Sequence, residues 1–155
     1  MKEYLIGVDG SYLDGEAYGG ICLLDRSDRK CITIRVTCPK REFISSRNIY
    51  GEVAAAIIGF GVAKQCLETT PDCTFTIVYD YLGIKNWLTG EWQSKKPIAA
   101  VYKHVWSQYP ELHDKINFHH VKGHQEVTDL YGYVNQVADN TASGKLDSPV
   151  VESDV

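Results

Sequence analysis

The chain has 155 residues, of which 44% are hydrophobic, and a formal net charge of −4. This length and composition are typical of one globular domain with a single core. The negative charge argues against a protein that binds nucleic acid through a strongly basic surface. No apolar run approaches the roughly 18 residues of a membrane span, and the first residues lack the pattern of a signal peptide. We expect a soluble, cytoplasmic monomer that does not bind membranes.

Five cysteines occur, at positions 22, 31, 38, 66 and 73. Their number is odd and no two are spaced as Cys-x-x-Cys, which argues against a disulfide framework and against a structural zinc site. Free thiols in a reducing compartment are therefore expected.

The first third of the chain predicts three strands, at residues 4–9, 18–24 and 30–38. Asp14 and Gly15 form a turn signal between the first two strands. In the third strand, apolar residues alternate with polar ones, as in an antiparallel strand with one buried face. These three strands should form an antiparallel meander.

The remainder predicts helices that alternate with strands. Residues 49–68 repeat apolar side chains at helical spacing. A strand, two helices, a strand and a final helix starting after Gly132 should follow, at residues 74–79, 82–88, 97–108, 116–121 and 135–142. The polar, acidic residues 147–155 are expected to form a flexible tail after a domain that spans residues 1–146.

This order predicts an α/β fold with a five-stranded mixed sheet, three antiparallel strands followed by two parallel ones, flanked by helices. If the first strand pairs with the fourth, their carboxyl ends lie side by side. Asp9 and Asp80 follow those two ends. Ligands usually bind at that rim of an α/β sheet.

Four acids stand out by position: Asp9, Glu52, Asp80 and Asp139. Taken singly, each has an ordinary explanation, as a turn residue, a partner of a helix dipole or a solvated helix residue. Together they would repel one another unless a cation neutralised them. Mg²⁺ prefers carboxylate oxygens, and two such ions can bind the attacking water and the leaving oxygen of a phosphoryl transfer.

A histidine follows the last predicted strand, in the sequence Val121-Lys122-Gly123-His124. A neutral histidine beside a phosphate can transfer protons or help the product to leave. A lone histidine in a loop is more often an ordinary surface residue. The same ordinary reading applies to His119 and His120, which should point to opposite faces of their strand.

Five motifs in this order resemble the type 1 ribonuclease H family. They are Asp9-Gly10-Ser11, Asn48-x-x-Gly51-Glu52, Tyr79-Asp80, Val121-Lys122-Gly123-His124 and Asn135-x-x-Ala138-Asp139. Residues 79–92 are especially similar to the branch related to caulimovirus viroplasmin-associated enzymes. The chain departs from the bacterial pattern at Tyr81, where a serine is common, in a long loop after His124 and in a short basic segment around Lys95.

The resemblance implies an endoribonuclease that cleaves the RNA strand of RNA–DNA hybrids, leaving 5′-phosphate and 3′-hydroxyl ends. It also implies two bound Mg²⁺ ions, with Mn²⁺ as a substitute, on Asp9, Glu52, Asp80 and Asp139. His124 would be a mobile catalytic histidine. The residues expected to bind the hybrid are Gly10, Ser11, Asn48 and Asn135. Two alternatives remain open: a nuclease of the same fold that acts on another nucleic acid, and a non-catalytic nucleic-acid-binding module.

Overall fold

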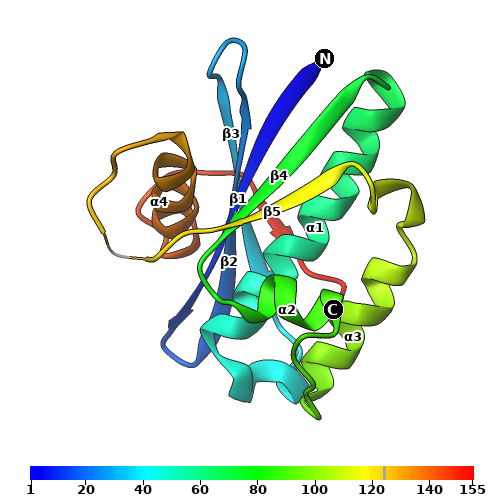
Figure 1. Ribbon diagram of the computed structural model, residues 1–155. Coiled ribbons are helices and arrows are strands. Elements are labelled where there is room, and N and C mark those ends of the chain that lie inside the picture. Colours follow the sequence, from blue (N-terminus) through cyan, green and yellow to red (C-terminus); the bar gives the residue numbers. More distant parts are fainter. Residues whose placement is uncertain (124) are drawn as a thin grey trace.

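The computed structural model describes residues 1–123 and 125–155 (Figure 1). The strands are β1 (Lys2–Leu13), β2 (Glu16–Asp25), β3 (Cys31–Cys38), β4 (Cys73–Tyr79), β5 (Ile116–His120) and β6 (Val150–Glu152). The α-helices are α1 (Asn48–Thr69), α2 (Gly83–Thr89), α3 (Pro97–Ser107) and α4 (Leu130–Ala142), and the 3₁₀ helices are η1 (Arg41–Ser46) and η2 (Pro110–Leu112).

Over the described residues the sheet has six strands, in the order β5-β4-β1-β2-β3-β6. The β1–β2 and β2–β3 pairs are antiparallel, and the β1–β4 and β4–β5 pairs are parallel. The α/β class and the mixed sheet are therefore confirmed. The expected count of five is corrected to six because β6 adds a parallel strand beside β3.

The β1–β2 hairpin extends beyond the apolar runs that predict its two strands. Pairing continues from Tyr4↔Asp25 to Leu13↔Glu16. Asp14 and Gly15 both have positive φ, at 52° and 79°, which is the backbone of a two-residue hairpin turn. Polar residues at the hairpin tip obscure the strand pattern, and the turn residues alone indicate how far the pairing extends.

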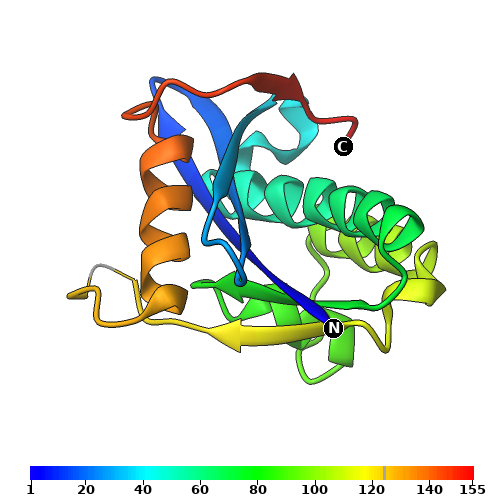
Figure 2. The same ribbon diagram turned by 90° about the horizontal axis from the view of Figure 1, so that it is seen from above.

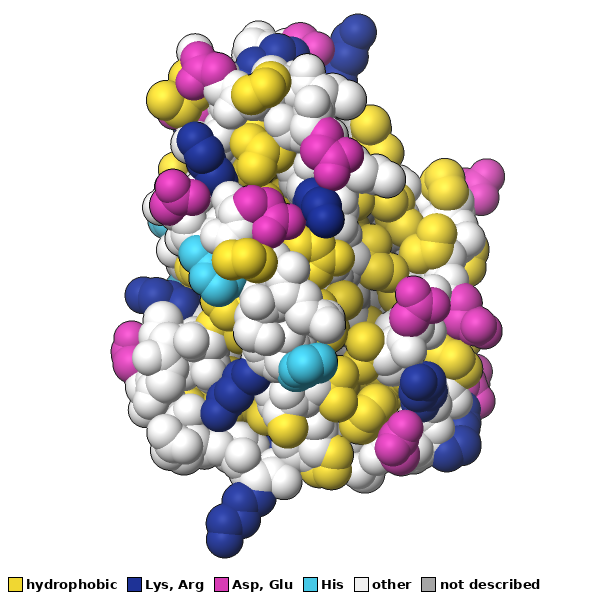
Figure 3. Space-filling model, turned by 90° about the vertical axis from the view of Figure 1, so that its right-hand side faces the viewer, with side chains coloured by type: hydrophobic (Ala, Val, Ile, Leu, Met, Phe, Trp, Pro, Cys, Tyr) yellow, Lys and Arg dark blue, Asp and Glu magenta, His cyan; other side chains and the backbone are white. Residues whose placement is uncertain are grey.

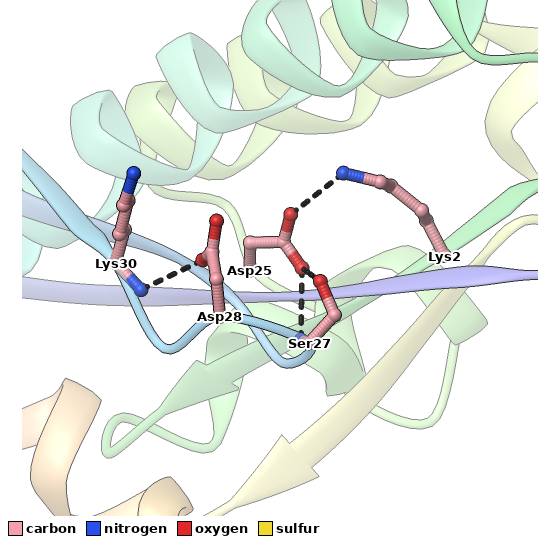
Figure 4. Close-up of polar contacts among 5 residues, drawn as sticks. All are labelled: Lys2, Asp25, Ser27, Asp28 and Lys30. Carbon is pink, nitrogen blue, oxygen red and sulfur yellow. Dashed lines mark hydrogen bonds and ion pairs between the residues drawn. The ribbon is translucent and has the colours of Figure 1, made fainter.

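The turn between β2 and β3 is held by short-range polar contacts (Figure 4). Asp25 Oδ1 accepts hydrogen bonds from the backbone nitrogen and the hydroxyl of Ser27, at 2.9 and 2.7 Å. Lys2 Nζ lies 2.9 Å from Asp25 Oδ2, which ties this turn to the start of β1. The hydrogen bonds to Asp25, with Lys2 contributing most, lower the pKa of its carboxyl to about 2.

Helices cover both faces of the sheet (Figure 2). Helices α1 and α3 lie on one face, and α4 crosses the other. Neighbouring residues of β1 therefore enter different cores: Ile6 packs in the large core beneath α1, and Leu5 packs with Val134 beneath α4. This alternation follows from the two-residue repeat of a strand whose faces are both covered.

The final residues pack against the domain instead of extending from it. Strand β6 pairs with β3 in the register Arg35↔Val150 to Thr37↔Glu152. Ser153 is 5% exposed, and its backbone nitrogen donates to Thr37 O at 2.8 Å. The segment 147–155, for which the sequence predicts a flexible tail, is thus held by backbone pairing, which its polar composition does not reveal.

The outer surface mixes charges of both signs. On the face shown in Figure 3, basic and acidic side chains are interspersed. None of the helices in the described part of the chain is long and apolar enough to cross a bilayer.

Candidate active site

Two of the predicted acids lie on neighbouring strands. The parallel β1–β4 ladder ends at Gly7↔Val78, and two further residues in the same register bring Asp9 beside Asp80. Asp9 remains inside β1, paired with Gly20 of β2, whereas Asp80 directly follows the end of β4. The sheet thus places these two acids at one rim, as the predicted strand order implies.

Glu52 reaches the same rim because α1 approaches the hairpin very closely. A Cβ atom on Gly51 would lie 1.9 Å from the backbone oxygen of Tyr18, and one on Gly10 would lie 1.9 Å from the backbone oxygen of Asn48. Glycine is therefore required on both sides of this contact. Glu52 is 4% exposed, and its carboxyl lies close enough to that of Asp9 for the Asp9 charge to raise the pKa of Glu52.

Helix α4 supplies the remaining residues from the opposite face of the sheet. Asp139 and Asn135, one helical turn apart, line a pocket together with Asp9 and Asp80. Asn135 is 7% exposed, and its side-chain nitrogen Nδ2 has no hydrogen-bond partner within residues 1–123 and 125–155. A buried donor without a partner costs free energy in the isolated protein, and Asn135 belongs to the lining of the pocket.

Their buried environment makes Asp9 and Glu52 harder to ionise. Burial raises the pKa of Asp9 to about 7, and the charges of Asp139 and Asp80 act in the same direction, against a hydrogen bond from the Gly10 nitrogen. Burial, followed by the charge of Asp9, raises the pKa of Glu52 well above its usual value. Two buried carboxyls that lie close together have this electrostatic signature.

Backbone groups hold two of the acids in place. The backbone nitrogen of Tyr81 donates to Glu52 Oε2 at 3.1 Å. The backbone nitrogen of Gly123 donates to Asp80 Oδ1 at 3.2 Å. A Cβ atom on Gly123 would lie 2.5 Å from Asp80 Oδ2, so the segment after β5 approaches Asp80 this closely because residue 123 lacks a side chain.

The donor set fits a hard divalent cation. Carboxylate oxygens around one pocket are the ligands that Mg²⁺ and Mn²⁺ prefer, and a cation there would offset the mutual repulsion of the carboxylates. Within residues 1–123 and 125–155, no three acidic, histidine or cysteine side chains already converge as a finished metal site. The acids therefore lie near one another but are not arranged as a complete coordination shell. The metal site remains a prediction.

The other predicted site residues have different placements. Ser11 pairs with Tyr18 in the hairpin, and the exposed Asn48 begins α1. Both lie outside the lining of the acidic pocket, near Asp9 and Glu52 in the chain. His124 lies outside the described residues.

Sequence reasoning missed the far wall of the pocket. Residues 125–129, with Gly132 and Gln136, line it opposite the strand ends. Helix α4 begins at Leu130, earlier than expected, because Asp129 caps it: its side chain accepts a hydrogen bond from the Gly132 nitrogen at 2.8 Å. An aspartate directly before an apolar residue is a recognised helix-start signal and would have located this boundary.

Solved structures with this fold include ribonucleases. RNase H1 from the halophilic archaeon Halobacterium salinarum is 16% identical, with a TM-score of 0.64 over 93% of this chain and 99% of that chain. LC11-RNase H1, isolated from compost and solved in complex with an RNA/DNA hybrid, is 14% identical, with a TM-score of 0.68 over 93% and 99% of the two chains. The prototype foamy virus protease-reverse transcriptase is 15% identical, with a TM-score of 0.64 over 93% of this chain and 21% of that chain.

At these identities the structural likeness establishes the fold. None of the curated proteins matches the sequence. The narrower resemblance to the viroplasmin-associated branch stays a prediction. The RNase H family model matches residues 1–146 of the 155, and the chain therefore belongs to the RNase H family.

Proposed function

We propose that this protein is an endoribonuclease that hydrolyses the RNA strand of RNA–DNA hybrids with two divalent metal ions, Mg²⁺ or Mn²⁺. The products would carry 5′-phosphate and 3′-hydroxyl ends. The observation that carries the proposal is the meeting of Asp9, Asp80 and Asp139 at one pocket, with Glu52 buried behind Asp9, in a chain of the RNase H family. One protein of similar fold was solved with an RNA/DNA hybrid.

Asp9, Glu52, Asp80 and Asp139 would hold the metal ions. Bound ions would neutralise the phosphate and lower the pKa of a water molecule for attack on phosphorus. The protein's own contribution is to gather four acids from two strands and two helices, with backbone donors fixing Glu52 and Asp80. His124 keeps the proton-transfer role that its motif implies.

Four residues would contact the hybrid: Gly10, Ser11, Asn48 and Asn135. The 2′-hydroxyl group distinguishes RNA from DNA at a binding site. Asn135 lines the pocket that would hold a phosphate, and its Nδ2 has no partner among the described residues. Sequence preference should be slight, since these groups recognise sugars and phosphates.

The test is cleavage of an end-labelled RNA–DNA hybrid with Mg²⁺ or Mn²⁺. Controls are a chelator, matched single-stranded RNA, duplex DNA, a four-way junction, and an Asp80→Asn variant whose fold is verified by circular dichroism. Internal cuts in the RNA strand of the hybrid, lost with chelator and in the variant, are expected. Exclusive cutting of the junction would assign another nuclease activity to the site, and folded protein inactive on every substrate would indicate a binding module.

A further inference from the structure

The last two residues of β5 are histidines that point to opposite faces of the sheet. His119 stacks on Tyr131 of α4, with ring centroids 3.9 Å apart. The exposed His120 packs against the ring of Tyr79, at 5.5 Å, and its Nε2 lies 2.8 Å from the backbone oxygen of Asp80. A carbonyl oxygen can only accept a hydrogen bond, so His120 must donate through Nε2–H.

The peptide unit that His120 contacts is the one between Asp80 and Tyr81. Its carbonyl oxygen accepts from His120 Nε2, and its N–H, on Tyr81, donates to Glu52 Oε2 at 3.1 Å. Both polar groups of one peptide plane are therefore bonded, one to a histidine and the other to a buried acid. The Cα atom at the start of this plane carries the Asp80 carboxyl.

This arrangement links His120 to two acids at once. A peptide unit is planar and rigid, so fixing its carbonyl also fixes the direction of its N–H. A hydrogen bond accepted by the carbonyl polarises the unit and strengthens the bond that the N–H donates. We infer that His120 is a positioning residue, which acts through the Asp80–Tyr81 peptide to orient the carboxyls of Glu52 and Asp80 for metal binding.

The chain contains a matched control for this role. The exposed His113 also bonds a backbone oxygen through Nε2, that of Trp106 at 2.9 Å, and its ring stacks on the Trp106 ring at 4.2 Å. Both histidines thus combine one bond to a carbonyl with one aromatic contact. The Trp106 carbonyl belongs to α3, away from the acids, so loss of the His113 bond should affect stability without affecting metal binding.

The experiment compares His120→Phe, His120→Gln and His113→Phe with the wild type. Phenylalanine retains a ring against Tyr79 but cannot donate, whereas the glutamine amide nitrogen can reach the position of Nε2. Mn²⁺ affinity is measured by titration calorimetry without substrate, and exchange of the Tyr81 amide proton is measured by NMR in metal-free protein. Hybrid cleavage is measured separately over a range of Mn²⁺ concentrations.

His120→Phe should weaken Mn²⁺ binding by roughly three- to tenfold, the worth of one net hydrogen bond, and should speed exchange of the Tyr81 amide proton. His120→Gln should restore most of both properties, and His113→Phe should match the wild type in both. Equal Mn²⁺ affinity and equal Tyr81 exchange in His120→Phe and His113→Phe would overturn the inference.

The inference rests on the proposed function, because that function requires the metal site. The role of His120 can nevertheless be refuted while the proposed function holds. If the wild-type protein binds Mn²⁺ and cleaves hybrid while His120→Phe behaves as the wild type does, the role of His120 is refuted and the nuclease stands. If the wild-type protein neither binds Mn²⁺ nor cleaves, the proposed function fails. In that case exchange of the Tyr81 amide proton is the deciding measurement. Faster exchange in His120→Phe supports the link from His120 through the Asp80–Tyr81 peptide to Glu52, and unchanged exchange refutes it.

Discussion

Asp9 of β1 and Glu52 of α1 lie close together across the contact between strand and helix, and burial raises the pKa of both carboxyls. A carboxyl pair so buried is costly to ionise fully, because each negative charge is desolvated and repels the other. The metal-free site therefore stores unfavourable free energy that a divalent cation would release on binding.

The stability of the metal-free protein should depend on pH in a direction set by Asp9. Its pKa is about 7 in the folded chain against 3.8 as the ordinary value, so the folded state binds more protons than the unfolded state between these values. Stability should then fall as pH rises from about 4 to about 7. Thermal unfolding with chelator should show this decline, which Mn²⁺ reverses and Asp9→Asn lessens without abolishing, because burial still raises the pKa of Glu52. A wild-type midpoint that rises over this range would contradict the assignment.

Asp80→Asn and Asp139→Asn should each lower hybrid cleavage by more than about a hundredfold, since residues that merely support metal ligands already contribute ten- to hundredfold. The folded structure should survive, because neither side chain is part of the apolar cores. The measurement is initial rate at saturating Mn²⁺, with Asp25→Asn as the control for loss of an acid elsewhere in the sheet. Activity of either variant near that of the control would remove that residue from the site.

Much of this site could be predicted because strands impose strict geometry. Asp9 and Asp80 follow apolar runs whose pairing is dictated by the order of elements, so their meeting follows from the topology. The Asp80–Tyr81 peptide could not be foreseen, because its partners come from α1 and β5 and any residue type supplies the same backbone groups. The docking of β6 was missed for the same reason: it depends on backbone pairing with β3, which leaves little trace in side-chain pattern.

Asn135→Leu should make the protein more stable and less active. Leucine has a similar shape but lacks the buried Nδ2 donor, which has no partner in the part of the chain that the structure describes, so the free energy of unfolding should rise by about 1 kcal/mol. Cleavage should fall roughly ten- to hundredfold if that donor bonds a charged phosphate oxygen. Calorimetric unfolding and steady-state rates on the hybrid measure the two effects. The exposed Asn117 gives the control, Asn117→Leu; unchanged cleavage in Asn135→Leu would show that the amide does not contact substrate.

Gly51→Ala should separate α1 from the hairpin. The new Cβ would lie 1.9 Å from the Tyr18 oxygen, and overpacking of this kind costs about 1–3 kcal/mol. Because Glu52 is the next residue, Mn²⁺ affinity should weaken as well. Gly61→Ala is the matched control in the same helix: its Cβ would meet nothing closer than the Tyr109 hydroxyl at 3.7 Å, so it should stabilise by up to about 1 kcal/mol. Equal stability of the two variants would contradict the close contact.

The final segment is anchored to α1 by the buried hydroxyl of Tyr50. That hydroxyl donates to the Val155 backbone oxygen at 2.7 Å and accepts from the Lys40 backbone nitrogen at 3.1 Å. Tyr50→Phe leaves both backbone groups without this partner, so the free energy of unfolding should fall by about 1–3 kcal/mol. Urea unfolding monitored by fluorescence measures the change.

A double-mutant cycle distinguishes this anchor from a general packing effect of Tyr50. Deleting residues 150–155 removes the acceptor at Val155 but keeps the donor at Lys40. If the hydroxyl acts through the final segment, Tyr50→Phe must cost less in the shortened chain than in the full chain, and the two changes must be non-additive. Strict additivity would mean that β6 and Tyr50 stabilise the domain independently, with the hydroxyl acting through Lys40 alone.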